Sequence, residues 1–275
     1  MSCGTRTVSQ DGDPRPSEEV LRLAIDHLEQ ARRWGLVRPR NLRLRLAALY
    51  QESGASGKAR NELNALLANE PEDHASRLQL AQLWLLDGRL GLARQQIQMV
   101  VESTDELKGD SHRSHGDRAI QAASQVLWGD LEARSGNHAA ALRHFDQALR
   151  VQPRNVQAHL ARGAMLATIG RLEEAAASFR TGVQLRPDSA AAHNNLAALL
   201  ARTDRNEEAL QHYHRSLVLM PDNPLAECNV GLLLTQLARY DEAERAFQRA
   251  LKLQPDYAAA HEGLARLKQS DEPTD

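Results

Sequence analysis

The chain has little of the chemistry that marks secreted, membrane-bound or nucleic-acid-binding proteins. It contains two cysteines, Cys3 and Cys228, so no disulfide framework is expected. Aromatic residues make up only 4% of its 275 residues, so alanine and leucine must supply most of the packing. The formal net charge of -2 gives no reason to expect binding to nucleic acid or to an anionic membrane.

Long hydrophobic runs are missing too. Residues 1–16 are polar, include Pro14 and Pro16, and hold no apolar segment that could serve as a signal peptide or membrane span. We therefore expect a cytoplasmic protein without direct membrane insertion, whose residues 1–16 form a disordered tail. Phosphate-binding loops and nucleophile–base sets are not visible, so no catalytic, cofactor-binding or metal-ligating residue is assigned and no enzyme is expected.

The pattern that is present is a repeat of 34 residues. A period of this length is typical of two-helix units that stack on one another. Four prolines mark it, namely Pro153, Pro187, Pro221 and Pro255. The units that end near them are 122–155, 156–189, 190–223 and 224–257.

Two further units, 40–73 and 74–107, precede these four. Pro71 and Pro153 are separated by two periods and 14 further residues, so an insertion or linker is expected at 108–121. Its glycine, serine and charge are typical of a loop. The chain is thus divided into a tail, a capping helix within 17–39, units at 40–107, the insertion at 108–121, units at 122–257, and a capping helix and tail at 258–275.

Each position of the repeat, counted from the first residue of a unit, favours one size of side chain. Small residues at the eighth and twentieth positions allow two helices to approach closely, and a large residue at the twenty-fourth fills the space between neighbours. The eighth position holds Ala47, Ala81, Gly129, Gly163, Ala197 and Gly231. The twentieth holds Ala59, Ala93, Ala141, Ala175, Ala209 and Ala243, and the twenty-fourth holds Leu63, Ile97, Phe145, Phe179, Tyr213 and Phe247.

Glycine at the fifteenth position ends the first helix of four units, where a left-handed residue turns the chain. Asp204 and Ala238 replace it in the last two units, so those two turns are expected to close differently.

These residues resemble the tetratricopeptide repeat family over 40–107 and 122 to about 268. The resemblance implies an all-α fold, a right-handed superhelical solenoid of helix-turn-helix units with a groove lined by the first helices. Arg162 departs from the pattern at a position that is elsewhere apolar, so its stem is expected to pack while its guanidinium reaches solvent.

Eleven histidines raise the question of a metal site. His159, His193 and His261 share one repeat position, and residues spread along a stack cannot converge on one ion, so packing is the favoured interpretation.

The resemblance places the groove on the second, fifth, ninth, twelfth and thirteenth positions of the first helices. A small and weakly charged floor of this kind suits an extended peptide or an amphipathic helix. With Asn195 and Asn229 at the sixth position, the candidate groove residues are Val126, Asp130, Arg134, Leu160, Ala164, Asn194, Asn195, Ala198, Arg202, Leu225, Cys228, Asn229, Leu232 and Gln236.

Asn195 and Asn229 lie 34 residues apart and are similar to the asparagine ladder in the repeats of protein O-glycosyltransferases, whose amides hold a peptide backbone. The alternative is that these amides cap or bridge neighbouring helices. Leu160 and Ala164 stand where a carboxylate clamp for chaperone tails would begin, so such tails are not the expected ligand.

We therefore expect a non-enzymatic scaffold that holds a peptide segment of a partner protein, as in an assembly factor for a multiprotein complex. The alternative is a substrate-recognition or adaptor subunit for a separately encoded enzyme such as a glycosyltransferase.

Overall fold

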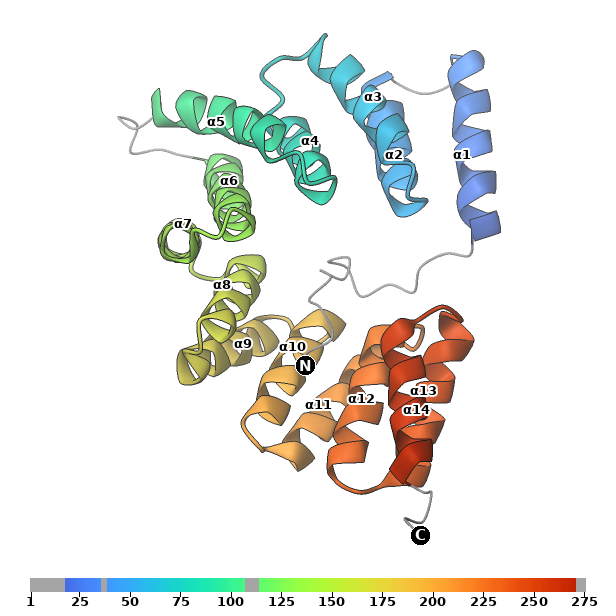
Figure 1. The fold of residues 1–275 in the computed structure, drawn as a ribbon. Coiled ribbons are helices and arrows are strands. Elements are labelled where there is room, and N and C mark those ends of the chain that lie inside the picture. Colours follow the sequence, from blue (N-terminus) through green and yellow to red (C-terminus); the bar gives the residue numbers. More distant parts are fainter. Residues whose placement is uncertain (1–17, 36–38, 107–113, 271–275) are drawn as a thin grey trace. The chain divides into compact units, whose positions relative to one another are not determined.

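The computed structural model describes residues 18–35, 39–106 and 114–270, and within these residues it is all-helical, with fourteen α-helices and no strand (Figure 1). The helices are α1 (Glu18–Arg33), α2 (Pro39–Glu52), α3 (Ser56–Leu67), α4 (His74–Leu86), α5 (Leu90–Glu106), α6 (His115–Arg134), α7 (His138–Val151), α8 (Val156–Thr168), α9 (Leu172–Leu185), α10 (Ala190–Arg202), α11 (Asn206–Leu219), α12 (Pro224–Gln236), α13 (Tyr240–Leu253) and α14 (Ala258–Ser270). The predicted fold class is confirmed at this level.

The helices alternate between first and second helices of the repeats, from the pair α2 and α3 to the pair α12 and α13. The chain forms two compact units, Arg15–Ala161 and the part that begins at Arg162, with the boundary inside α8. Within each unit a helix packs on its neighbours in the sequence, for example α10 on α11 and α12 on α13. The predicted tail at 1–16 and Ser17 lie outside the described residues.

Proline and a capping residue set the start of four first helices. Proline cannot continue the preceding helix, and two residues later a side-chain oxygen accepts a hydrogen bond from the new helix's backbone. The four bonds are Ser76 N to Asp73 Oδ1 (3.2 Å), Ala158 N to Asn155 Oδ1 (3.0 Å), Ala192 N to Ser189 Oγ (3.2 Å) and Ala226 N to Asn223 Oδ1 (3.1 Å).

Close approach of the two helices of a repeat depends on the small residues that the sequence repeats. All six alanines at the twentieth position have no exposed surface. At the eighth position, a Cβ atom on Gly163 would lie 2.7 Å from Cε1 of Phe179, and one on Gly231 would lie 2.7 Å from Cε1 of Phe247. The phenylalanine at the twenty-fourth position therefore packs directly against a helix backbone.

The turns at Asp204 and Ala238 close in the same way as the glycine turns, so the expectation of a different closure is wrong. Both residues adopt a φ of 56°, against 81° at Gly170. The backbone hydrogen bonds are also shared, because Arg239 N bonds to Leu234 O (2.9 Å) as Arg171 N does to Leu166 O (2.9 Å). Packing of the flanking helices imposes the left-handed conformation on residues that disfavour it.

The expected insertion at 108–121 is also shorter than the sequence suggests. α6 begins at His115, so residues 115–121 form helix, while 107–113 lie outside the described residues. The cause is a capping box in which Ser114 Oγ accepts from Asp117 N (3.1 Å) and Asp117 Oδ2 accepts from Ser114 N (3.1 Å).

Arg162 also differs from expectation. Its Nη1 donates to Ser178 Oγ on α9 (2.8 Å) instead of reaching only solvent. The described helices include none that is long and apolar enough to span a membrane.

Candidate functional site

Ten of the candidate groove residues lie in the second unit, on the first helices α8, α10 and α12, and α10 contacts α12 directly. We refer to these ten as the C-terminal candidate surface. They are Ala164 on α8; Asn194, Asn195, Ala198 and Arg202 on α10; and Leu225, Cys228, Asn229, Leu232 and Gln236 on α12.

Solvent reaches these residues unequally. Cys228 has no exposed surface and Asn194 is only 6% exposed, so both shape the surface mainly by packing. The exposed members are Ala164, Arg202 and Gln236, and the half-buried ones are Asn195, Ala198, Leu225, Asn229 and Leu232. The accessible part of the surface is therefore a mixture of amide and small or aliphatic groups together with the guanidinium of Arg202.

The asparagine side chains on this surface have unused hydrogen-bonding capacity. No hydrogen bond joins the side-chain amide of Asn195 or Asn229 to another residue that the structure describes. Asn194 Oδ1 is buried and also has no partner among the described residues. A buried polar atom without a partner is costly, and this applies to Asn194 Oδ1, whereas Asn195 and Asn229 are half-buried and reach solvent.

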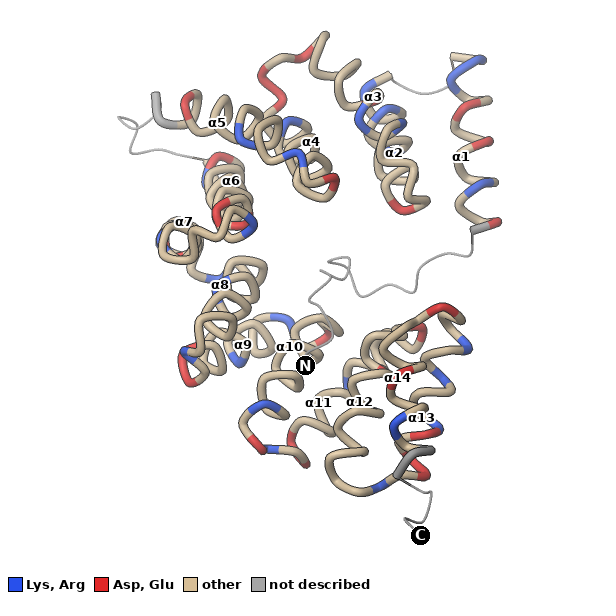
Figure 2. Tube along the Cα trace, viewed as in Figure 1, with Lys and Arg blue, Asp and Glu red and all other residues tan. Residues whose placement is uncertain are grey.

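Charge is almost absent from the helices that carry the surface. Arg202 is the one acidic or basic residue of α10 and Glu227 the one of α12, so most of both traces in Figure 2 is tan. Arg202 Nη2 donates to Ala167 O (3.2 Å), which holds the guanidinium against the end of α8. The surface therefore has no cluster of like charges with which to attract an acidic or basic segment.

The remaining candidates, Val126, Asp130 and Arg134 on α6 and Leu160 on α8, lie in the first unit. Val126 is 9% and Leu160 8% exposed, so both are mainly core residues. Burial raises the pKa of the half-buried Asp130 to about 6, although Arg134 one turn later opposes the shift. Asp130 thus changes charge closer to neutral pH than an exposed carboxylate.

A polar contact between the two helices of a repeat recurs at the fourth and twenty-third positions. It joins Arg43 Nη1 to Glu62 Oε2 (2.9 Å), Arg77 Nη1 to Gln96 Oε1 (3.3 Å), His144 Nδ1 to Gln125 Oε1 (2.8 Å) and the Nδ1 atoms of His193 and His212 (2.9 Å). The sequence analysis missed this contact, although a constant separation of 19 residues between polar side chains was the signal.

The histidines at the fourth position also have a second partner. The Nε2 atoms of His159, His193 and His261 bond to the carbonyl oxygens of Pro153, Pro187 and Pro255 at 3.0, 3.0 and 2.8 Å. Each of these three side chains therefore ties its helix to the repeat before it. Among the described residues, no group of three or more histidine, cysteine, aspartate and glutamate side chains could hold a metal ion.

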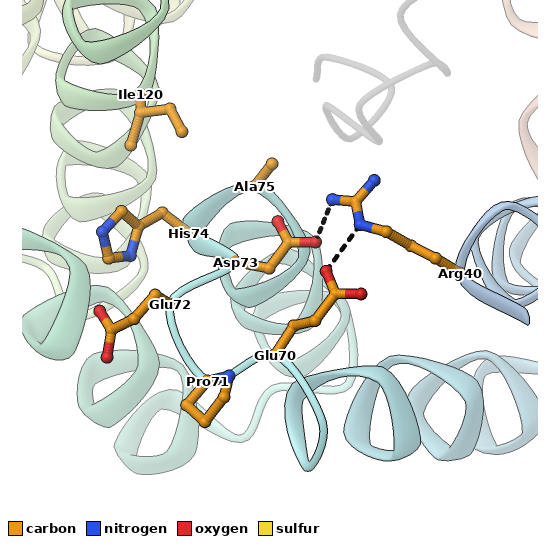
Figure 3. A pocket seen from close by; sticks show the side chains of 8 residues that line it. All are labelled: Arg40, Glu70, Pro71, Glu72, Asp73, His74, Ala75 and Ile120. Carbon is orange, nitrogen blue, oxygen red and sulfur yellow. Dashed lines mark hydrogen bonds and ion pairs between the residues drawn. The ribbon is translucent and has the colours of Figure 1, made fainter.

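A separate cavity of about 530 Å³ opens in the first unit, where the loop before α4 meets α2 and α6 (Figure 3). It is lined by Arg40, Glu70, Pro71, Glu72, Asp73, His74, Ala75 and Ile120. Ile120 belongs to the helical turns that the sequence analysis assigned to the insertion, so this cavity was missed. The Ser114–Asp117 capping box was the sequence signal that a helix begins at His115.

Most charges in this cavity are already paired with one another. Arg40 bonds to Glu70 Oε2 through Nε (2.7 Å) and to Asp73 Oδ2 through Nη2 (2.5 Å). Burial alone would raise the pKa of Asp73, but hydrogen bonds from Ser76 and the Arg40 guanidinium hold it below its ordinary value. These bonds fix the start of α4 and already occupy most of the charged groups that could bind a charged ligand. His74 Nδ1 is an exception, because it is buried without a partner among the described residues.

Comparison with protein families identifies the repeats. One model described as "Tetratricopeptide repeat" matches residues 44–106 and 126–190, and a second with the same description matches 188–256. Together they cover more than two thirds of the chain. No curated protein sequence matches the chain.

Solved structures with the same fold include two that align well. A thermophilic tetratricopeptide repeat protein of Thermus thermophilus, TTC0263, has a TM-score of 0.58 at 24% identity, over 71% of this chain and 99% of that one. The APC/C hetero-tetramer Cut9–Hcn1 has a TM-score of 0.67 at 14% identity, over 91% of this chain and 46% of that one. The chain thus spans less than half of that second structure's chain, and the likeness concerns the fold.

Proposed function

Because the chain belongs to the tetratricopeptide repeat family, we propose that it is a non-enzymatic scaffold that binds a peptide segment of a partner protein. The binding surface in this proposal is the C-terminal candidate surface on α8, α10 and α12. Holding one partner segment in this way suits an assembly factor for a multiprotein complex.

The observation that carries the proposal is the pair of unpartnered amides at Asn195 and Asn229. They stand at the same repeat position on adjacent first helices, and both are half-buried. An asparagine amide offers both donor and acceptor, so each can satisfy the N–H and C=O of a peptide backbone without reading its side chains. The near absence of charge on α10 and α12 favours a neutral segment over an acidic tail.

A second function, recognition of substrates for a separately encoded enzyme such as a glycosyltransferase, rests on the same pair of amides. The family models match tetratricopeptide repeats in general and do not single out glycosyltransferase repeats. The two functions share one binding surface and differ in what the partner does afterwards.

The test is to select binders from a phage-displayed library of random peptides on the immobilised full chain, then to measure their affinities by calorimetry. Replacing both Asn195 and Asn229 by alanine should weaken binding of a selected peptide tenfold or more, since each lost hydrogen bond contributes roughly 1 kcal/mol. The melting temperature should stay near that of the wild type, because the amides make no bonds within the described fold.

Asn64→Ala is the matched control, since Asn64 is an exposed asparagine on the second helix α3 and does not belong to the proposed surface. Unchanged affinity in the folded double variant, or failure to select any peptide that the wild type binds, would remove the proposal.

A further inference from the structure

The cavity in the first unit exists because α6 begins earlier than the repeat requires. The repeat register places the start of this helix at residue 122, but α6 begins at His115. The other first helices begin within one residue of their register positions. Residues 115–121 add about two helical turns, and Ile120 in these turns lines the cavity together with the loop before α4 (Figure 3). The cavity is therefore a feature of this chain and not of the repeat.

Negative charge exceeds positive charge around the cavity. Three carboxylates and one guanidinium line it, those of Glu70, Glu72, Asp73 and Arg40. Arg40 pairs with Glu70 and Asp73, whereas Glu72 is exposed and has no hydrogen bond or ion pair to another described residue. Carboxylates remain in excess even with the guanidinium of Arg77, which donates to a carbonyl of the same loop but does not line the cavity. The additional turns of α6 carry one acidic and one basic residue, which leave the balance unchanged. A cationic ligand is therefore favoured.

His74 adds a hydrogen-bond acceptor that has no partner among the described residues. Ser103 Oγ donates its one proton to Val100 O (2.9 Å), so it accepts from His74 Nε2, 3.3 Å away. Nε2 therefore carries the proton of the neutral ring, and Nδ1 is left as a buried acceptor. Figure 3 shows the ring on the same side of the cavity as Glu72 and away from the Arg40 pairs. An unpaired buried acceptor is costly, and a donor in the cavity would satisfy it once the ring turns towards the cavity.

The rest of the lining is apolar and suits an aliphatic stem. Pro71, Ala75 and Ile120 contribute it. The volume of about 530 Å³ lies within the range of small-ligand sites, about 300 to 1,000 Å³. A lysine side chain meets both requirements, because its methylene groups pack on apolar surface while its ammonium group supplies three N–H donors and one positive charge.

We propose that this cavity binds a lysine side chain of a partner protein. The ammonium group donates to the Glu72 carboxylate and to His74 Nδ1. The stem packs against Ile120, and the carboxylates of Glu70 and Asp73 strengthen the attraction. The site shares no residue with the C-terminal candidate surface, so it can bind lysine whether or not that surface binds a peptide.

Titration of the isotope-labelled full chain, followed by NMR, tests the proposal. Nα-acetyl-lysine methylamide should shift the backbone amide signals of Glu72, Ala75 and Ile120, and the shifts should saturate with a Kd of about 10 mM or below. The norleucine analogue has the same stem without the ammonium group. It should bind at least about tenfold more weakly, because the charge-assisted hydrogen bonds are lost. Equal shifts from the two compounds, or no saturable shift up to about 50 mM of the lysine compound, overturn the proposal.

Two variants test the contacts. Glu72→Gln should weaken binding of the lysine compound about threefold, as expected for one exposed ion pair. His74→Phe should also weaken it, because a ring of similar shape remains and the acceptor is lost. Glu207→Gln is the matched control, since Glu207 is an exposed glutamate on α11 in the second unit, and it should bind like the wild type. Equal affinity in Glu72→Gln and the control, or wild-type affinity in the folded His74→Phe protein, contradicts the proposal.

The source of the ammonium group is tested with n-butylamine. This compound carries the ammonium group on the same stem but lacks the peptide backbone of a lysine residue, so it should bind no more tightly than the lysine compound. Clearly tighter binding of the free amine would overturn the assignment to a partner protein.

Discussion

His193 and His212 face each other with their Nδ1 atoms 2.9 Å apart, and the protons of both rings are determined by their partners. The Pro187 carbonyl can only accept, so His193 Nε2, 3.0 Å away, carries the proton. His193 Nδ1 is then the acceptor, and His212 Nδ1–H donates to it. The neutral pair is satisfied, whereas two protonated rings would direct N–H groups at each other.

This pair predicts acid sensitivity of the second unit. Burial lowers the pKa of His193, with Arg215 adding to the shift and the Pro187 carbonyl opposing it. Burial and the neighbouring His193 lower the pKa of His212, with Arg180 adding and Glu208 opposing. The unfolded chain therefore binds protons more readily, and stability falls as the pH drops below the ordinary histidine value of about 6.5.

We expect the melting temperature to decrease from pH 7.5 to pH 5.5, and His193→Gln to reduce that decrease. Glutamine restores the glutamine–histidine contact found at Gln125 and His144 (2.8 Å) while removing one of the two rings. Thermal melts of both proteins at the two pH values provide the measurement. An equal decrease in the two proteins would show that the pair is not responsible.

Ala238→Gly should stabilise the protein. Ala238 holds a φ of 56°, and a left-handed conformation costs an L-residue about 1 to 2 kcal/mol, part of which is offset by the greater entropy of glycine in the unfolded chain. Urea unfolding should show an increase of up to about 1 kcal/mol. The reverse change, Gly170→Ala, should destabilise by a similar amount, since φ is 81° there and no atom lies within 4 Å of an added Cβ.

Gly163→Ala should destabilise, and Phe179→Leu should partly rescue it. An added Cβ at Gly163 would lie 2.7 Å from the Phe179 ring, and the crowding typically costs about 1 to 3 kcal/mol. Alanine already lies opposite leucine in the first repeat, at Ala47 and Leu63. A double-mutant cycle measured by urea unfolding gives the coupling, and simple additivity of the two changes would contradict the expected contact.

Ala175→Leu should be far more harmful than Ala177→Leu. Ala175 has no exposed surface at the contact between two helices, whereas Ala177, two residues further along α9, is exposed. Overpacking at Ala175 should cost about 1 to 3 kcal/mol, and Ala177 should change stability by less than about 0.5 kcal/mol. Similar melting temperatures for the two variants would mean that the assigned repeat register is wrong.

The fold could be predicted well because the residue at each repeat position can be compared among six units. A single alanine says little, but Ala59 and its five equivalents identify a close contact, and all six are buried. The turn at Ala238 was misjudged because local preference was allowed to outweigh the packing of the helices around it. The start of α6 was misplaced because a short capping box was overlooked in a segment of loop-like composition.

The candidate surface was harder to predict, because exposure depends on neighbours that the repeat does not specify. Cys228 and Asn195 were assigned to the same groove, yet one has no exposed surface and the other is half-buried. The inter-helix pairs at the fourth and twenty-third positions escaped notice because their members change identity from repeat to repeat while their roles persist.

The hydrogen bond from the fourth position to the preceding proline carbonyl couples the unfolding of a repeat to that of the repeat before it. At the boundary after Pro221 the corresponding residue is Glu227, whose side chain accepts a hydrogen bond from Arg249 Nε (2.8 Å) in place of the bond to the proline carbonyl. Neighbouring repeats unfold together only as far as their mutual contacts couple them. The backbone amides of α12, α13 and α14 should therefore exchange with deuterium earlier than those of α10 and α11, with the break falling at Pro221.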